Sequence, residues 1–292
     1  MKRFGTDGIR GLAGEELSPE FVFQIGKSIG AYLNETYPGE TISVCIGRDT
    51  RVSGERIEQN LVDGLKIVGV NSVLFGVIPT PAVSVLCKKD NYQMGIVISA
   101  SHNPAEYNGI KLFNKNGEKA EEKAEERIET LFSCPLLIQE TPGMPGKILI
   151  EKNAQEKYVN SVVEKYKELD LSNYTILVDC ANGATGVTTP EVFRKLGANV
   201  EAINTKNDGD SINNKCGSTF PNLIKEHLNA SKKTCDFIFS HDGDGDRVLS
   251  FTPNGVVIDG DHMITSAALS RARKNQLQNK MSSIMLKKLT RS

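Results

Sequence analysis

The sequence predicts an α/β protein of successive domains, each with a mixed, largely parallel sheet covered by helices. Segments in which apolar residues recur at helical spacing alternate with short apolar segments typical of buried strands. This alternation favours parallel sheets with helices on their faces. A break rich in proline and glycine at residues 135–146 separates two such cycles. At 292 residues and 39% hydrophobic content, the chain has the length of about two globular domains.

The first cycle begins with a helix after Ser18. Pro19 suits the first helical position, and apolar residues recur at helical spacing as far as Leu33. The later elements expected in this cycle are a strand at 42–46, a helix at 57–68, strands at 72–75 and 94–99, and a charged amphipathic helix at 118–132.

A second cycle follows a boundary near residues 150–153. Its expected elements are a helix at 154–167, a strand at 175–179, a helix at 190–196, and strands at 199–203 and 236–240. Two further strands, 248–252 and 256–258, flank Pro253-Asn254-Gly255, which is a strong hairpin signal. We therefore divide the chain into domains at residues 1–152 and 153–253, with residues 254–292 opening a third.

The composition favours a small-molecule partner in the cytoplasm. The net charge is −1, so the basic field that nucleic acid or an anionic membrane would require is missing, and we expect neither partner. The six cysteines are scattered without zinc-like spacing and are expected to be free thiols. The N-terminus has no apolar signal core, which also favours a cytoplasmic protein.

The strongest chemical signal is Asp242-Gly243-Asp244-Gly245-Asp246-Arg247. Glycines between three carboxylates allow a tight backbone that can turn several oxygens toward one point. Oxygen ligands suit Mg²⁺ or Ca²⁺ rather than zinc. A calcium EF-hand is excluded, because Arg247 and Pro253 stand where that loop needs Gly and Glu. A solvated acidic turn is the alternative.

Two glycine-rich turns could bind phosphate. In residues 5–11, backbone N–H groups and the guanidinium of Arg10 could hold a phosphate, although a simple entry turn would have the same composition. Residues 47–54 form an arginine-rich turn after the first expected strand, where α/β proteins place ligand loops. Such charged turns are often merely solvated.

Ser101 follows the strand expected at 94–99, within Ala100-Ser101-His102-Asn103-Pro104. This position at the carboxyl edge of a sheet suits a nucleophile or phosphate carrier, although serine is also a common turn residue. Lys111 is near enough in sequence to share the site. A haloacid dehalogenase-like reading of Asp242 to Gly245 is minor, because Asp246 stands where that motif has Thr or Val.

The motifs at residues 5–11, 100–104 and 242–247, in this order and at these separations, closely resemble those of the α-D-phosphohexomutase superfamily. Residues 2–8, 178–184 and 212–219 look most like its bacterial phosphoglucosamine mutase branch, and the resemblance covers about residues 1–265. It implies four domains around a central cleft. It also implies an enzyme of the isomerase class that interconverts glucosamine 6-phosphate and glucosamine 1-phosphate for peptidoglycan precursors.

The resemblance implies that Ser101 is a phosphoserine, which passes its phosphate to the sugar and receives the other phosphate back. A hexosamine 1,6-bisphosphate would be both the intermediate and the activator. One Mg²⁺ per chain would be held by Asp242, Asp244 and Asp246 together with an oxygen on phosphorylated Ser101. The implied partner is a phosphosugar, and a homodimer is left open.

The same resemblance implies roles for four further residues. Arg247 and Arg10 would bind phosphate oxygens. His102 and Lys111 would border the reacting group, with Lys111 as a proton donor or acceptor if the site lowers its pKa.

The chain also departs from the family pattern. The Gly-Glu-x-Ser-Gly-His sugar loop of domain three and the Arg-x-Ser-Gly-Thr phosphate loop of domain four are absent, and Phe220 stands where the closest pattern often has His. We therefore expect an incomplete third domain, no fourth domain and impaired mutase turnover. A phosphomannomutase or phosphoglucomutase, and a non-catalytic fragment that binds Mg²⁺ and phosphosugar, are the alternatives. Residues 270–292, with seven Lys or Arg and no acidic residue, are interpreted as the end of a shortened chain rather than a binding arm.

Overall fold

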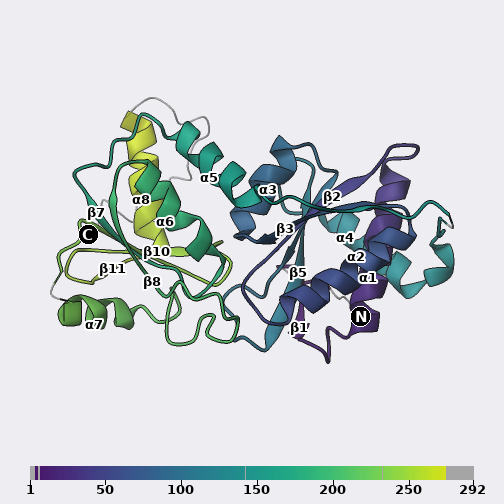
Figure 1. Cartoon of the computed structure of the whole chain (residues 1–292), viewed down its shortest axis with the longest axis horizontal. Coiled ribbons are helices and arrows are strands. Elements are labelled where there is room, and N and C mark those ends of the chain that lie inside the picture. Colours follow the sequence, from purple (N-terminus) through teal and green to yellow (C-terminus); the bar gives the residue numbers. More distant parts are fainter. Residues whose placement is uncertain (1–3, 6, 142, 232, 274–292) are drawn as a thin grey trace.

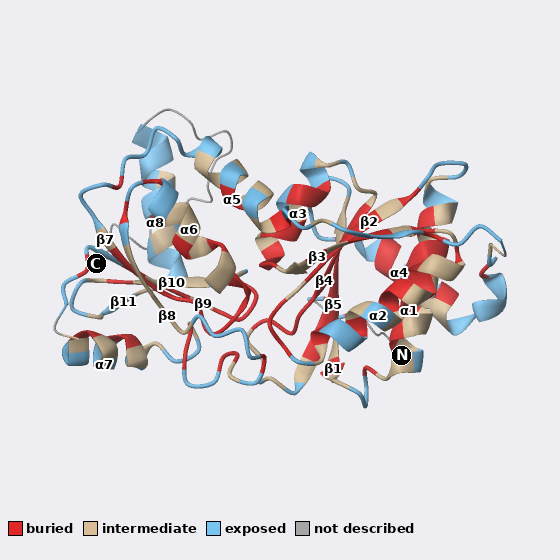
Figure 2. Cartoon of the chain, in the orientation of Figure 1, coloured by how far each residue is buried: buried red, intermediate tan, exposed pale blue. Residues whose placement is uncertain are grey.

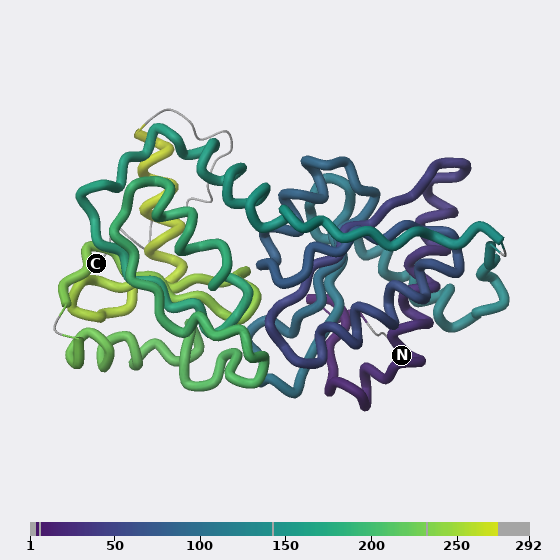
Figure 3. Tube along the Cα trace, in the orientation of Figure 1, coloured from purple at the N-terminus to yellow at the C-terminus, as the bar shows by residue number. Residues whose placement is uncertain are grey.

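The computed structural model of the chain describes residues 4–5, 7–141, 143–231 and 233–273. Two α/β lobes lie side by side along its long axis (Figure 1 and Figure 3). We call the helices and strands between residues 9 and 150 the first lobe, and those between residues 154 and 273 the second lobe. Most of the predicted basic tail, namely Lys274, Lys280, Lys287, Lys288 and Arg291, lies outside the described residues.

The first lobe is built on a six-stranded sheet with the order β1-β5-β4-β2-β3-β6. Its strands are β1 (Ile9–Leu12), β2 (Ser43–Arg48), β3 (Asn71–Val77), β4 (Met94–Ile98), β5 (Tyr107–Asn114) and β6 (Ile148–Ile150). β5 runs antiparallel to both of its neighbours, and the pairs among β4, β2, β3 and β6 are parallel. The sheet is therefore mixed and largely parallel, as the sequence predicts.

Helices cover both faces of this sheet. One buried apolar cluster joins it to α1 (Pro19–Thr36), α2 (Gly54–Ile67) and α4 (Glu122–Ser133). A second cluster joins the other face to α3 (Thr80–Lys89) and to the start of α5 (Ala154–Lys165). Strand residues alternate between the two clusters: Val44 and Ile46 face the first, and Cys45 faces the second. The central strands are accordingly the most buried part of the lobe (Figure 2).

The second lobe has a five-stranded sheet with the order β11-β10-β9-β7-β8. Its strands are β7 (Thr175–Asp179), β8 (Asn199–Ile203), β9 (Phe237–His241), β10 (Val248–Phe251) and β11 (Val257–Ile258). β7 pairs in parallel with β8 and β9, whereas β10 is antiparallel to β9 and β11. Buried clusters place α5 and α6 (Thr189–Lys195) on one face and α7 (Asn222–Ser231) on the other. α8 (Gly260–Arg273) is largely exposed (Figure 2).

The predicted elements are confirmed apart from their ends. Ser18 accepts a hydrogen bond from the backbone N–H of Phe21 at 3.2 Å and so caps α1. The predicted start of a helix at residue 118 is wrong, because α4 begins at Glu122. Before it, the Asn114 side chain accepts from the N–H groups of Asn116 and Glu118, which holds those residues in a turn.

The expected hairpin around Pro253-Asn254-Gly255 is confirmed by the antiparallel pairing of β10 with β11. The domain boundaries at residues 152 and 253 stay predictions. α5 contributes to buried clusters of both lobes, and β11 lies beyond residue 253 in the sheet of the second lobe. Within the described residues, no helix combines the length and the apolar character that crossing a membrane requires.

Helices α1 and α2 touch through two glycines. A Cβ at residue 64 would lie 2.1 Å from the carbonyl oxygen of Phe23, and one at residue 26 would lie 2.2 Å from the carbonyl oxygen of Leu61. Both obstacles are backbone atoms, so only movement of a whole helix could relieve the clash. The close approach of the two helices therefore requires glycine at both positions.

We expect Gly64→Ala to lower the free energy of unfolding by about 1–3 kcal/mol, because overpacking forces the backbones apart. Guanidinium chloride denaturation measures this change. Gly260→Ala is the control: nothing lies within 4 Å of a Cβ there, so its stability should change by no more than about 0.5 kcal/mol. Equal stabilities of the two variants would contradict the close-contact argument.

Candidate functional site

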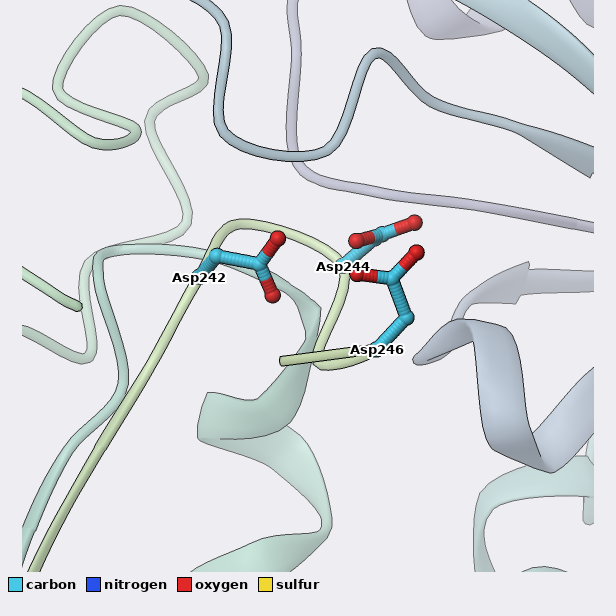
Figure 4. A group of neighbouring side chains, drawn as sticks. All are labelled: Asp242, Asp244 and Asp246. Atoms are coloured by element: carbon cyan, nitrogen blue, oxygen red, sulfur yellow. The ribbon is translucent and has the colours of Figure 1, made fainter. Parts of the chain in front are cut away.

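The acidic loop, residues 242–247, connects β9 with β10. The three aspartates each offer a carboxylate oxygen, and these atoms all lie within 4.8 Å of one another. The carboxylate of Asp242 faces those of Asp244 and Asp246 (Figure 4). Asp242 and Asp244 are each 0% exposed, so a solvated turn does not describe them. Asp246 is the partly exposed member, with a side chain that is 33% accessible.

Ser101 of the first lobe contacts the acidic loop. It lies just beyond β4, is fully buried, and has a φ of 55° in the left-handed region. Its hydroxyl donates to Oδ2 of Asp242 at 2.5 Å and lies 3.2 Å from Oδ1 of Asp246. The two strongest sequence signals, which are separated by about 140 residues, are thus in direct contact.

Two more residues of the first lobe contact the acidic loop. Lys111 of β5 places Nζ 2.5 Å from Oδ2 of Asp244 and 2.7 Å from Oδ2 of Asp246. Thr80, the first residue of α3, donates its hydroxyl to the same Asp244 oxygen at 2.6 Å and its N–H to the Asp244 carbonyl at 2.9 Å. The N-terminus of α3, which carries partial positive charge, therefore faces Asp244.

The crowded carboxylates perturb one another. Burial, followed by the charges of Asp244 and Asp246, raises the pKa of Asp242 to about 7. Burial also acts to raise the pKa of Asp246, but the Lys111 ammonium outweighs it and holds this pKa below its usual range. Burial acts to lower the pKa of Lys111, yet the two carboxylates raise it. The role of Lys111 as a proton donor or acceptor stays a prediction.

His102, which follows Ser101 in the sequence, lies near the guanidiniums of Arg10 and Arg247. Burial, then the positive charges of Arg247 and Arg10, lower the pKa of His102. Arg247 donates its backbone N–H to Oδ1 of Asp242 at 3.2 Å, and half of its side chain is accessible. Arg10 of β1 pairs with Asp7 at 3.3 Å, and its buried Nε has no hydrogen-bond partner among the described residues. Both guanidiniums therefore have donors available for an anion.

The family models match both lobes. Residues 1–134 match "Phosphoglucomutase/phosphomannomutase, alpha/beta/alpha domain I", and residues 156–255 match domain II of the same family. The chain belongs to the α-D-phosphohexomutase superfamily. The fold class expected from the sequence is that of this superfamily.

Among curated members of the superfamily, the chain is similar to phosphoglucosamine mutases. It is 39% identical to that of Clostridioides difficile (94% of this chain, 61% of that protein) and 41% identical to that of Natranaerobius thermophilus (95% and 61%). It thus spans 61% of the length of these relatives. The crystal structure of a phosphoglucomutase/phosphomannomutase family protein from Burkholderia thailandensis is similar with a TM-score of 0.79 at 25% identity, covering 93% of this chain and 59% of that one.

The superfamily implies a magnesium ion, and the acidic loop fits one. The donor set consists only of oxygens, which hard divalent cations prefer. Oδ1 of Asp244 is buried and has no hydrogen-bond partner among the described residues. An unpaired carboxylate oxygen at that depth is costly unless a cation contacts it. The residues in place therefore suit Mg²⁺.

A pocket of about 470 Å³ opens beside His102 at the junction of the lobes. Its second-lobe lining includes Ile212, Asn214 and Phe220. Phe220, which stands where the closest family pattern often has His, thus lines the pocket next to His102.

Sequence reasoning missed Thr80, whose contact with Asp244 depends on packing across the lobes. The available signal was Pro81, since proline in the first turn marks the start of a helix. The sequence predicts either a ligand loop or a solvated turn at 47–54, whereas Arg51 in this turn is 1% exposed and pairs with Asp49 at 2.9 Å.

We expect Lys111→Met to lower the free energy of unfolding by about 3–5 kcal/mol in the absence of added divalent cations. The substitution leaves Asp244, a buried charge, without its ammonium partner. Lys157→Met is the matched control, because Lys157 also lies between two carboxylates, Asp90 and Glu151, but 40% of its side chain is accessible. The control should lose less than about 1 kcal/mol. Similar losses in urea denaturation of the two variants would show that burial of the Lys111 pairs is not decisive.

Proposed function

We propose that the chain is a phosphoglucosamine mutase, which interconverts glucosamine 6-phosphate and glucosamine 1-phosphate through phosphorylated Ser101. The contact of Ser101 Oγ with Asp242 at 2.5 Å carries the proposal, because it joins a nucleophile to an oxygen-rich cation site. The identity of 39–41% to proteins of this name supports the choice of sugar. The activity is a proposal because the chain spans 61% of those relatives.

In the proposed reaction, a sugar hydroxyl attacks the phosphorus of phosphorylated Ser101. The bond from phosphorus to Ser101 Oγ breaks, the hydroxyl proton leaves to solvent or a nearby base, and the sugar becomes a bisphosphate. After the bisphosphate reorients, Ser101 Oγ attacks the other phosphate and releases the isomeric monophosphate. The same hexosamine 1,6-bisphosphate, added from solution, would phosphorylate Ser101 initially and act as the activator.

The residues of the site have separate roles in this scheme. Asp242, Asp244 and Asp246 would hold one Mg²⁺, with an oxygen on Ser101 as a further ligand. When bound, the ion would offset the negative charge of the phosphoryl group during transfer. The ammonium of Lys111 offsets the remaining carboxylate charge next to Ser101.

The phosphosugar would bind beside Ser101. Arg10 and Arg247 supply guanidinium donors for phosphate oxygens. His102, whose pKa their charges lower, lines the pocket of about 470 Å³. We propose this pocket as the space next to the sugar. The reaction would take place in the cytoplasm, where the free thiols of the described structure stay reduced.

Ser101→Ala is expected to abolish incorporation of labelled phosphate from a hexosamine 1,6-bisphosphate, because the acceptor oxygen is lost. Ser28→Ala is the control: Ser28 is also buried, but its hydroxyl bonds only the Gln24 carbonyl within α1. The control should be labelled as fast as the unmodified chain. Labelling that persists in Ser101→Ala would remove Ser101 from the proposed role. A folded chain that binds Mg²⁺ but takes up no phosphate would favour the non-catalytic alternative.

Asp244→Asn is expected to weaken Mg²⁺ binding by about tenfold or more, which corresponds to at least about 1.4 kcal/mol. Asparagine keeps the shape of the side chain but removes one of three ligand charges. Asp261→Asn, in the exposed first turn of α8, serves as the control and should bind as the unmodified chain does. Isothermal titration calorimetry with MgCl₂ measures both. An unchanged isotherm for Asp244→Asn would exclude the acidic loop as the metal site.

A further inference from the structure

The serine loop, residues 99–103, is held by donors from both lobes. The carbonyl oxygens of Ser101 and Asn103 accept hydrogen bonds from Nη2 of Arg51 in the first lobe, at 3.0 and 2.8 Å. The same two oxygens accept from Nδ2 of Asn213 in the second lobe, at 2.8 and 3.1 Å. Two side chains from opposite lobes therefore bind the same pair of backbone acceptors.

The first-lobe donor fixes the loop by itself. Arg51 and Asp49 form an ion pair at 2.9 Å in which both side chains are 0% exposed. Asp49 also accepts from Ser99 Oγ at 2.6 Å, and that hydroxyl accepts from the N–H of Ser101 at 2.8 Å. Nη1 of Arg51 donates to the carbonyl oxygens of Tyr107, at 2.8 Å, and Pro104. Every donor group of this guanidinium is thus used inside the protein, and Arg51 supports the serine loop rather than a ligand.

The second-lobe donor, Asn213, lies next to the acidic loop. Asn213 is 5% exposed, and its own N–H donates to the Ala181 carbonyl at 2.9 Å. Gly243 of the acidic loop lies so close that a Cβ there would be 2.9 Å from both Nδ2 of Asn213 and the Ser101 carbonyl oxygen. Asn213 therefore lies where the acidic loop and the serine loop meet.

We infer that Asn213 is a positioning residue for transfer to Ser101. Its carboxamide fixes the second lobe against the serine loop, and this sets the distance between Ser101 Oγ and Asp242. The inference rests on the proposed function and adds a residue to it. Small misplacements of reacting groups can cost about 100-fold in rate, so a single interlobe contact at this point can control transfer.

A purely stabilising role explains Asn213 less well. Because Arg51 already donates to both carbonyls, removing the carboxamide leaves neither acceptor without a partner. Oδ1 of Asn213 has no hydrogen-bond partner among the described residues, so only the nitrogen of the amide is used. The Asn213 side chain therefore connects the second lobe to the backbone of Ser101 and Asn103.

The test compares Asn213→Gly with Thr50→Val. Glycine is chosen because residue 213 has a φ of 57°, which alanine would adopt only with strain. Thr50 makes another buried interlobe bond, from its hydroxyl to the Asn182 carbonyl at 2.7 Å, so its side chain donates to the second lobe and not to the serine loop. Asn213→Asp is the second variant: it keeps the shape and tolerates this φ but has no N–H to donate.

We expect Asn213→Gly and Asn213→Asp to slow phosphate incorporation into Ser101 by about 10- to 100-fold. Thr50→Val should stay within about twofold of the unmodified chain, because the serine loop keeps all its partners. The Mg²⁺ affinity of Asn213→Gly should also stay within about twofold, since the three aspartates remain. Amide hydrogen exchange of residues 99–103 should be faster in both Asn213 variants and unchanged in Thr50→Val.

Equal slowing in Thr50→Val and the Asn213 variants would overturn the inference, because any interlobe bond would then serve. Wild-type labelling and wild-type exchange in both Asn213 variants would overturn it as well. If even the unmodified chain takes up no phosphate, the proposed function fails, while amide exchange still decides whether Asn213 positions the serine loop. The two failures are therefore distinguishable.

Discussion

The crowding of three aspartate carboxylates is the constraint on which the arrangement of the lobes depends. The acidic loop belongs to the second lobe, and apart from its own Arg247 the described groups that offset its charge come from the first lobe: the Lys111 ammonium, the Thr80 hydroxyl and the N-terminus of α3. At an effective dielectric near 20, charges about 4 Å apart interact by about 4 kcal/mol, so separated lobes would leave a strongly repelling cluster. The electrostatics of the site thus also hold the two lobes together.

Where the serine loop meets the acidic loop, the backbones lie so close that the residues there must be small or have all their polar groups hydrogen-bonded. Gly243 allows the acidic loop to lie against the Ser101 carbonyl, and the left-handed φ of Ser101 turns its hydroxyl toward Asp242. Such a backbone conformation costs about 1–3 kcal/mol for a non-glycine residue and persists only where surrounding contacts fix it. The buried pair of Arg51 and Asp49 supplies those contacts, which explains why two charges are buried in a turn that binds no substrate group in the proposed scheme.

The sequence was sufficient for features that depend on local pattern. Strands and helices with clear periodicity were found. Ser101 was predicted as a site residue because it follows a strand at the edge where α/β proteins bind ligands, and the three aspartates because glycines separate their carboxylates. Thr80, Arg51 and Asn213 could not be identified in this way. Each acts through a hydrogen bond to residues between 50 and 164 positions away, and a lone threonine, arginine or asparagine in a turn has no pattern that specifies such a partner. Their roles come from packing of the lobes, which no local rule predicts.

If Ser101 is phosphorylated as proposed, the charge balance of the site links its phosphorylation to cation binding. Three carboxylates already face one ammonium, and a phosphate on Ser101 would add about 1.5 to 2 negative charges within contact of Asp242. Arg10 and Arg247 would offset part of this, although in the described structure their guanidiniums lie 3.3 Å from Asp7 and 3.9 Å from Asp246, respectively. A divalent cation at the carboxylates would therefore favour the phosphorylated serine. By thermodynamic reciprocity, the phosphorylated serine must raise the affinity for that cation by the same factor.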